Sequence, residues 1–332
     1  MPSPKIVLGG DVGGTKTLLK LAEVNARGVW KSLREQRYES CAYQGFESIV
    51  EDFLRGDVPD SACFGVAGPV KDNMAKITFL PWFIESDSIS EVFGIRDVKL
   101  INDFQAAGYG IDALEDGDLL SLNSGKPEIH GPRSLIGAGT FLGEGLLVWQ
   151  RDGYVALSSE GGHADFAPRG SLQAELLMSL NSRAGEYVPY GSLLSGNGLA
   201  VIYEFLHEHR GMTDALGLLS NKGNADLPLA VSQGALLHND PLASAALDLF
   251  IDIYGAEAGN MALRTLPTGG VYITGGIAPQ IVLGLTNGRF MRAFLDKGGF
   301  STLLSDIPVA VVLNPKVGLL GAMLCAARMQ AN

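Results

Sequence analysis

A glycine-rich turn between two apolar runs occurs twice in this chain of 332 residues, and this repeat constrains the fold more than any other feature. Residues 6–15 read IVLGGDVGGT and residues 134–140 read SLIGAGT, and a further apolar run follows each of them. Such a pattern is typical of two antiparallel strands joined by a tight turn. The repeat therefore predicts an internally duplicated α/β protein with a cleft between its halves.

The rest of the chain alternates between strand and helix patterns. Apolar residues spaced on one face predict a helix over residues 46–54, within a first half of order βββαβαβ that opens with a three-strand antiparallel meander. In the second half, strands are predicted over 134–157, and helices dominate from Ser171 to about Leu266. The clearest of these helices begins at Asp240-Pro241, with an acidic N-cap and Pro at the first helical position. A last strand at 271–274 and a terminal helix beginning near Gly318 complete the pattern. The clustering of the 43 glycines indicates tight turns or backbone close to a ligand, because glycine tolerates positive φ without strain.

The composition limits the classes of function. With 25 Lys and Arg against 36 Asp and Glu, the net charge is −11, so nucleic acid and anionic membranes are not expected partners. Cys41, Cys63 and Cys325 are far apart in sequence, which argues against a disulfide framework and a zinc site. The longest apolar stretch, Gly318 to Ala327, is shorter than the roughly 20 residues that span a bilayer. We expect a cytoplasmic protein.

The two glycine turns are candidates for binding phosphate. Such a turn frees backbone N–H groups that form an anion-binding concavity, and the Thr15 hydroxyl adds a donor. The Asp11 carboxylate could hold Mg²⁺ through water. A hairpin that carries these residues without function is the alternative for the first turn alone. Neither turn is a Walker loop, because no Gly-Lys-Ser/Thr follows.

Two other polar groups stand at predicted turns. Asn102 and Asp103 follow a buried strand, where they act either as the N-cap of a helix or as a general base with a neighbouring hydroxyl-binding amide. Glu160 and His163 flank two glycines, so they either bind sugar hydroxyls or form a plain polar turn. A metal site there lacks a third ligand.

Seven motifs follow one another along the chain. They are Asp11–Thr15, Ile101–Phe104, Gly137–Thr140, Glu160–Pro168, Leu194–Leu199, Gly269–Ile277 and Gly318–Ala322. Together they closely resemble the bacterial glucokinase family of the hexokinase/actin-like ATPase superfamily, over essentially the whole chain. The related repressor, open-reading-frame and kinase (ROK) group resembles the chain less, because its Cys-rich zinc motif is absent.

The resemblance implies an α/β, two-domain hexokinase/actin-like (ribonuclease-H-like) kinase fold with an interdomain cleft. The small domain is expected at residues 1–112 plus 316–332, and the large domain at residues 113–315. The implied reaction is ATP-dependent phosphorylation of the 6-hydroxyl of glucose, a small-molecule sugar substrate. The implied assembly is a homodimer.

The resemblance also implies roles for individual residues. Asp103 is the expected catalytic base, and Asn102, Asp103, Glu160 and His163 are expected to bind the sugar. The residues expected to bind ATP and Mg²⁺ are Asp11, Gly13, Gly14, Thr15, Gly137, Gly139, Thr140, Gly275 and Gly276. Asp11 is the one expected to hold Mg²⁺, through water.

Three positions depart from the family pattern, all implied to lie near the sugar. Phe141 stands in a loop that usually reads Gly-Thr-Gly-Leu-Gly, Phe79 replaces an Asn, and Gly191 replaces a sugar-binding Glu. Glu186 is a nearby carboxylate in sequence. Beside glucose phosphorylation, the alternatives are a kinase for a different sugar and a non-catalytic sugar- or nucleotide-sensing protein in which Phe141 obstructs the γ-phosphate. The presence of Asp103 favours a kinase.

Overall fold

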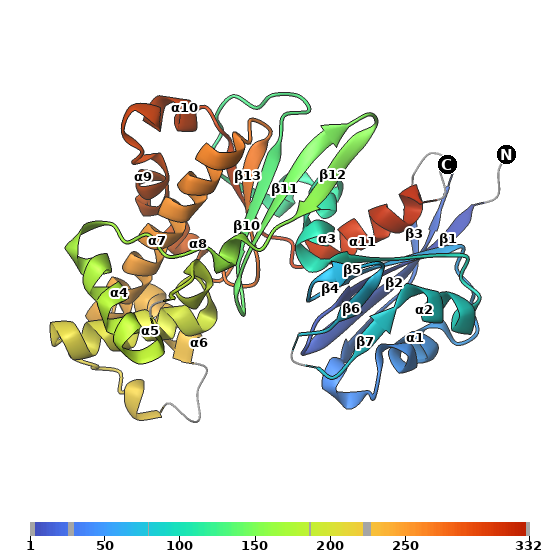
Figure 1. Ribbon diagram of the computed structural model, residues 1–332, viewed down its shortest axis with the longest axis horizontal. Coiled ribbons are helices and arrows are strands. Elements are labelled where there is room, and N and C mark those ends of the chain that lie inside the picture. Colours follow the sequence, from blue (N-terminus) through green and yellow to red (C-terminus); the bar gives the residue numbers. More distant parts are fainter. Residues whose placement is uncertain (1–3, 26–29, 79, 186, 222–226, 330–332) are drawn as a thin grey trace. The chain divides into compact units, whose positions relative to one another are not determined.

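The computed structural model describes residues 4–25, 30–78, 80–185, 187–221 and 227–329. The chain divides into two compact units (Figure 1). Unit 1 comprises Met1–Asp116, Tyr154–Ser158 and Asn314–Asn332, and unit 2 comprises Gly117–Gly153 and Ser159–Leu313. Phe79 and Glu186, two residues named above for their sequence position, lie outside the described residues.

Unit 1 contains a five-stranded sheet of order β3-β2-β1-β4-β8. Its strands are β1 (Lys5–Val12), β2 (Lys16–Val24), β3 (Trp30–Glu39), β4 (Ser61–Val66) and β8 (Asp97–Asn102). Strands β1, β2 and β3 form the predicted antiparallel meander, while β1, β4 and β8 are parallel. The carboxyl ends of these three parallel strands therefore meet at one edge of the sheet.

Alternate residues of the sheet supply two separate cores. Leu8 and Phe64 pack with apolar residues of α1 on one face, while Val7 and Cys63 pack with residues of α3 and α11 on the other. The helices of unit 1 are α1 (Phe46–Leu54), α2 (Ser86–Phe93), α3 (Asp103–Gly110) and α11 (Val317–Arg328). A small sheet, β5 (Val70–Lys71), β6 (Met74–Lys76) and β7 (Phe83–Glu85), completes the unit.

The C-terminal helix α11 packs on α3 with direct backbone contact (Figure 1). A Cβ at Gly321 would overlap the carbonyl oxygen of Ala106, and a Cβ at Gly110 would overlap the carbonyl oxygen of Val317. Neither glycine has a positive φ, so close approach of the two helices is the reason that glycine is needed. Packing of α11 therefore fixes the helix that begins at Asp103.

Unit 2, together with Tyr154–Ser158, forms a six-stranded sheet of order β12-β11-β10-β13-β14-β9. Its strands are β9 (Leu119–Asn123), β10 (Arg133–Ala138), β11 (Leu142–Gln150), β12 (Gly153–Ser158), β13 (Gly270–Thr274) and β14 (Val309–Val312). As β1 does in unit 1, β10 pairs antiparallel with the next strand and parallel with β13, which pairs parallel with β14. The first five strands repeat the order of the unit 1 sheet, which confirms the predicted duplication.

Helices fill most of the remainder of unit 2. They are α4 (Gly170–Ala184), α5 (Gly196–Arg210), α6 (Leu227–His238), α7 (Pro241–Thr265), α8 (Val282–Leu285), α9 (Arg289–Leu295) and α10 (Ser301–Ser305). Helix α7 starts as its sequence predicts, because the Asp240 carboxylate accepts the backbone N–H of Ala243 at 2.8 Å and Pro241 occupies the first turn. In the described part of the chain, every helix is too short or too polar to cross a bilayer.

Candidate active site

Asp103 lies at the carboxyl edge of the unit 1 sheet, as the first residue of α3 directly after β8. Asn102 caps the helix: its Oδ1 accepts the N–H of Phe104 at 2.9 Å, and its Nδ2 donates to the carbonyl of Gly68 at 3.1 Å. Gln105 completes the capping box by accepting the Asn102 N–H at 3.1 Å. The N-cap interpretation of Asn102 is therefore confirmed, and this cap fixes the position of the Asp103 carboxylate beside it.

The charge of Asp11 acts on the carboxyl group of Asp103 at this edge. Burial raises the pKa of Asp103 to about 6; the hydrogen bond from Phe104 N–H opposes this shift, and the charge of Asp11 adds to it. Burial also raises the pKa of Asp11, while the nearby Lys16 ammonium lowers it. Asp103 is thus a carboxylate near neutral pH that is more basic than an exposed aspartate.

These two carboxylates fit Mg²⁺. Carboxylate oxygens are its preferred protein ligands, and a divalent cation would offset the repulsion that raises the pKa of Asp103. Groups of three or more His, Cys, Asp or Glu able to hold a metal do not occur within the described ranges. A Mg²⁺ ion here would therefore take its remaining ligands from phosphate oxygens and water, which is its usual mode at phosphoryl-transfer sites.

The turn between β1 and β2 carries Gly13, Gly14 and Thr15. Gly13 N–H donates to the Lys16 carbonyl at 3.0 Å and closes the turn. Ser40 braces it from outside, because its backbone N–H donates to the Thr15 carbonyl at 2.9 Å and its hydroxyl donates to the Gly13 carbonyl at 2.8 Å. Thr15 itself is exposed, so its hydroxyl is accessible to a ligand.

Unit 2 has a matching arrangement at the carboxyl ends of β10 and β13. Gly137 is the penultimate residue of β10, Gly139 and Thr140 lie in the loop that follows that strand, and Gly275 and Gly276 follow β13, with Ile277 N–H donating to the Ala138 carbonyl at 3.3 Å. Gly275 has φ +85°, and a Cβ there would lie 2.5 Å from the Ala138 carbonyl oxygen. The two glycine segments are thus neighbours within unit 2.

Helix α5 begins against this loop. Gly196 N–H donates to the Gly139 carbonyl at 3.0 Å, and the Ser195 hydroxyl caps the helix by accepting Gly198 N–H at 3.1 Å. A helix N-terminus of this length favours an anion. A Cβ at Gly139 would have one atom within 4 Å, at 3.9 Å, and a Cβ at Gly276 would have none. Both glycines therefore border open space.

Positive φ does not explain most of the candidate-site glycines, which leaves backbone close to a ligand as the other expected reason. Among those proposed for the nucleotide, Gly275 alone has a positive φ; those without it are Gly13, Gly14, Gly137, Gly139 and Gly276. At Gly139 and Gly276 the backbone borders open space, as expected of backbone that a ligand approaches closely.

Glu160 and His163 flank a short 3₁₀ turn, Gly161–His163, and both side chains are exposed. The turn closes through His163 N–H donating to the Glu160 carbonyl at 2.9 Å, and the Tyr187 hydroxyl donates to the His163 carbonyl at 2.6 Å. Exposed carboxylate and imidazole groups on a braced turn can hydrogen-bond sugar hydroxyls.

A buried carboxyl pair lies beneath this turn, and the sequence analysis missed it. Glu144 on β11 and Glu257 on α7 are both buried, with Arg264 ion-paired to Glu257 and 3.9 Å from Glu144. Glu144 Oε1 has no hydrogen-bond partner among the described residues, and a Cβ at Gly161 would overlap its carboxylate. The one sequence signal was a glutamate within an otherwise apolar stretch of α7.

Replacing Glu144 with glutamine is expected to flatten the pH dependence of stability. Burial, and next the charge of Glu257, raise the pKa of Glu144 from 4.5 to about 7, while Arg264 lowers it. The stability contributed by protonated Glu144 is thus complete below pH 4.5 and lost as the pH rises through about 7. The loss is about 3 kcal/mol, and glutamine has no proton to lose. Urea unfolding of wild type and Glu144→Gln between pH 5 and 8 measures this loss in the free energy of unfolding.

The matched control is Glu175→Gln, at an exposed glutamate that pairs with Arg210. This control is expected to keep the wild-type pH dependence, because an exposed pair contributes little to the free energy of unfolding. Parallel pH profiles for wild type and Glu144→Gln would contradict the assignment of the slope to Glu144.

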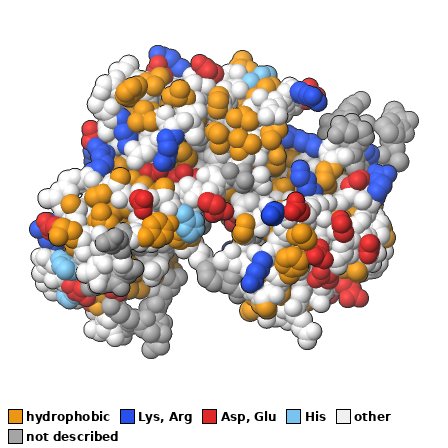
Figure 2. Space-filling model, viewed as in Figure 1, with side chains coloured by type: hydrophobic (Ala, Val, Ile, Leu, Met, Phe, Trp, Pro, Cys, Tyr) orange, Lys and Arg blue, Asp and Glu red, His pale blue; other side chains and the backbone are white. Residues whose placement is uncertain are grey.

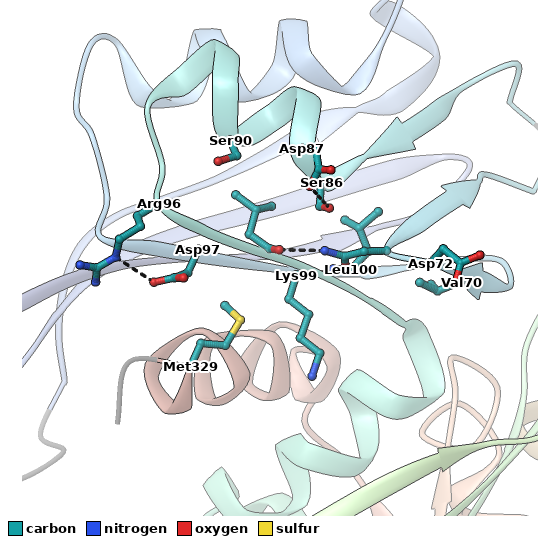
Figure 3. Close-up of a pocket in the computed structure, with 12 residues that line it drawn as sticks. Val70, Asp72, Ser86, Asp87, Ser90, Arg96, Asp97, Lys99, Leu100 and Met329 are labelled. Carbon is teal, nitrogen blue, oxygen red and sulfur yellow. Dashed lines mark hydrogen bonds and ion pairs between the residues drawn. The ribbon is translucent and has the colours of Figure 1, made fainter. Parts of the chain in front are cut away.

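A pocket of about 640 Å³ lies at the opposite end of β8 from Asp103 (Figure 3). Asp97, Lys99 and Asp87 line it, and Arg96 pairs with Asp97 at 3.0 Å. Because the parallel strands end at the other edge, this pocket is separate from the candidate active site. On the face shown in Figure 2, the described basic side chains are scattered among acidic ones rather than gathered into one basic surface.

The sequence matches the family model described as glucokinase over residues 8–329. A glucokinase of Nostoc sp. is 42% identical over 340 residues, covering 98% of this chain and 99% of that protein. The crystal structure of a glucokinase from an Antarctic psychrotroph has a TM-score of 0.84 and 27% identity, covering 98% and 99% of the two chains. A ROK-family glucokinase from Streptomyces griseus, solved in complex with glucose and AMPPNP, has a TM-score of 0.63 and 22% identity, covering 97% and 99%. This chain has the hexokinase/actin-like fold and belongs to the glucokinase family.

Proposed function

We propose that this protein transfers the γ-phosphoryl group of ATP to the 6-hydroxyl of glucose. The observation that carries the proposal is Asp103, a carboxylate fixed at the carboxyl edge of the unit 1 sheet with its pKa raised to about 6. A base whose pKa lies near the working pH is ionised and still accepts a proton effectively. Family membership and the glucose named in a structural relative support the choice of reaction.

In the proposed reaction, Asp103 accepts the proton of the sugar hydroxyl as the hydroxyl oxygen attacks the γ-phosphorus and ADP leaves. Glu160 and His163 orient the sugar by hydrogen-bonding its other hydroxyls, as does Asn102 through the second N–H of its amide.

The nucleotide phosphates are proposed to bind the glycine turns. These are Gly13, Gly14 and Thr15 between β1 and β2, and Gly137, Gly139 and Thr140 at the end of β10, where the N-terminus of α5 favours the negative charge. Gly275 and Gly276 are proposed to line the adenosine side of the nucleotide. Asp11 would hold Mg²⁺ through water. When bound, Mg²⁺ neutralises charge on the phosphates.

The structure weakens the argument for a non-catalytic sugar- or nucleotide-sensing protein, which was that Phe141 obstructs the γ-phosphate. A Cβ at Gly139 would meet no atom of the Phe141 ring within 4 Å, so the ring does not fill the open side of the glycine loop. The cytoplasmic location, the domain boundary near residue 112 and the homodimer that the resemblance implied stay predictions.

Purified protein is expected to release ADP from Mg·ATP in a glucose-dependent, saturable manner and to form glucose 6-phosphate. This follows from the proposed positions of base, sugar-binding groups and glycine turns. Coupled ADP assays with glucose, mannose, galactose and glucosamine provide the measurement. Saturable release with another hexose but not with glucose would support the kinase for a different sugar, and no release with any hexose would reject the proposal.

The pH profile serves as an internal control on the base. Because protonated Asp103 cannot accept a proton, kcat/KM for glucose is expected to fall about tenfold per pH unit below pH 6. An activity that stays constant down to pH 5 would reject Asp103 as the base.

A further inference from the structure

Phe141 lies in the turn between β10 and β11, and its ring is in contact with the backbone at Gly191. The atom within 4 Å of a Cβ at Gly139 is the Phe141 carbonyl oxygen, not the ring. A Cβ at Gly191 would instead overlap three ring atoms, Cζ, Cε1 and Cε2. The ring therefore occupies the space in which any side chain at position 191 would lie.

Gly191 is glycine because of this ring and not because of its backbone. It is buried and lacks a positive φ, so its conformation is open to other residues. Its segment is also held firmly, since Leu194 N–H donates to the Tyr190 carbonyl at 2.8 Å and Tyr190 N–H donates to the Ala164 carbonyl at 2.9 Å. A side chain at position 191 must therefore displace the Phe141 ring.

The Phe141 ring also contacts His163. The two ring centroids are 4.5 Å apart with an interplanar angle of 32°. His163 and Glu160 are exposed and Phe141 is partly exposed, so an apolar surface lies next to two polar groups within unit 2. Ligand sites combine these elements: apolar walls limit shape, and a few polar groups fix orientation.

We propose that Phe141 is a specificity-determining residue of the acceptor site. Its ring, held over Gly191, forms a fixed apolar wall beside His163 that admits an unsubstituted hexose and excludes a hexose with an added acyl or alkyl group facing the ring. The inference rests on the proposed function, because it requires the acceptor to bind at Glu160 and His163. It assigns Phe141 to the sugar and not to the phosphates.

The claim that the Phe141 ring fills the space beside position 191 is tested with Gly191→Ala, Phe141→Leu and the double variant. Leucine lacks the three ring atoms that the methyl group added by Gly191→Ala would overlap, so it makes room for that group. Gly191→Ala is expected to raise KM for glucose at least tenfold and to leave KM for ATP within twofold. In the Phe141→Leu background the same alanine is expected to change KM for glucose less than threefold.

The specificity part is tested with Phe141→Leu alone. For N-acetylglucosamine, N-acetylmannosamine and 3-O-methylglucose, kcat/KM relative to glucose is measured in wild type and variant. At least one of these ratios is expected to rise tenfold or more. Phe300→Leu, at an exposed phenylalanine of the same unit, is the matched control and should keep the wild-type ratios.

Measurements on the wild-type protein distinguish a failure of the proposed function from a failure of the inference about Phe141. If wild type does not phosphorylate glucose, the proposed function fails, and the inference fails with it. If wild type does, but Phe141→Leu keeps all three ratios, the inference alone is overturned. A rise in KM for ATP instead of glucose in Gly191→Ala would likewise overturn it, because it would place the ring at the nucleotide.

Discussion

Asp103→Asn is expected to lower kcat with glucose about 1,000-fold, within the range that general-base catalysis contributes. Asparagine cannot accept the proton of the sugar hydroxyl. Its side-chain oxygen can still accept the N–H of Phe104, which Asp103 Oδ1 accepts at 2.9 Å, so the first turn of α3 is preserved. The measurement is ADP release at saturating glucose and Mg·ATP, with the melting temperature recorded alongside.

Asp97→Asn is the matched control for this change. Asp97 lies at the other end of the same strand, where it pairs with Arg96, an exposed residue (Figure 3). Wild-type kcat is expected for Asp97→Asn. Should Asp103→Asn keep a tenth or more of wild-type kcat while remaining folded, Asp103 is not the base.

Gly321→Ala is expected to destabilise unit 1 by about 3 kcal/mol or more, at the upper end of the range for overpacked cores. The added methyl group would overlap the carbonyl oxygen of Ala106 and lie 2.6 Å from the backbone nitrogen of Gly110. Both atoms are helical backbone, so they cannot rotate away as a side chain would. Urea unfolding followed by circular dichroism measures the loss, and a fall in kcat is expected because α3 carries Asp103.

Gly299→Ala provides the comparison for this substitution. A Cβ at Gly299 has no atom within 4 Å, and its φ is not positive, so its expected effect is within about 0.5 kcal/mol. Equal urea midpoints for Gly321→Ala and Gly299→Ala would show that α3 and α11 separate at little cost.

Much of the fold was predictable because its signals are local. The strand–turn–strand repeat, the meander of unit 1 and the N-cap at Asp240 each depend on residues close in sequence, and each is confirmed. Strand β14, by contrast, is four residues long, and strand β9 pairs with it from far away in sequence. Neither segment has enough alternation to be recognised alone.

The candidate site also contains some features with local sequence signals and others that depend on residues far apart in sequence. The motifs predicted Asp103, the glycine loops and the turn at Glu160–His163, and the structure places Asp103 at the start of α3 and the others in or directly beside turns. The contact of the Phe141 ring with Gly191 joins residues 50 positions apart, and the pairing of Glu144 with Glu257 joins residues more than 100 apart. Such contacts depend on tertiary packing, which a single sequence does not display.

The contact between α3 and α11 also affects when the packing of unit 1 can form during synthesis. Unit 1 includes both ends of the chain, whereas unit 2 is one continuous stretch of translation apart from the five residues Tyr154–Ser158. The ribosome therefore finishes all of unit 2 before it makes α11, and until then Gly110 and Ala106 lack the helix that packs against them. Domains generally fold in order from the N-terminus. Here the sheet of unit 1 is synthesised before unit 2, but its packing is completed only when α11 has been synthesised after unit 2. A nascent chain that lacks α11 therefore carries Asp103 on a helix without this packing partner, so the proposed base is fixed in place only after α11 has been made.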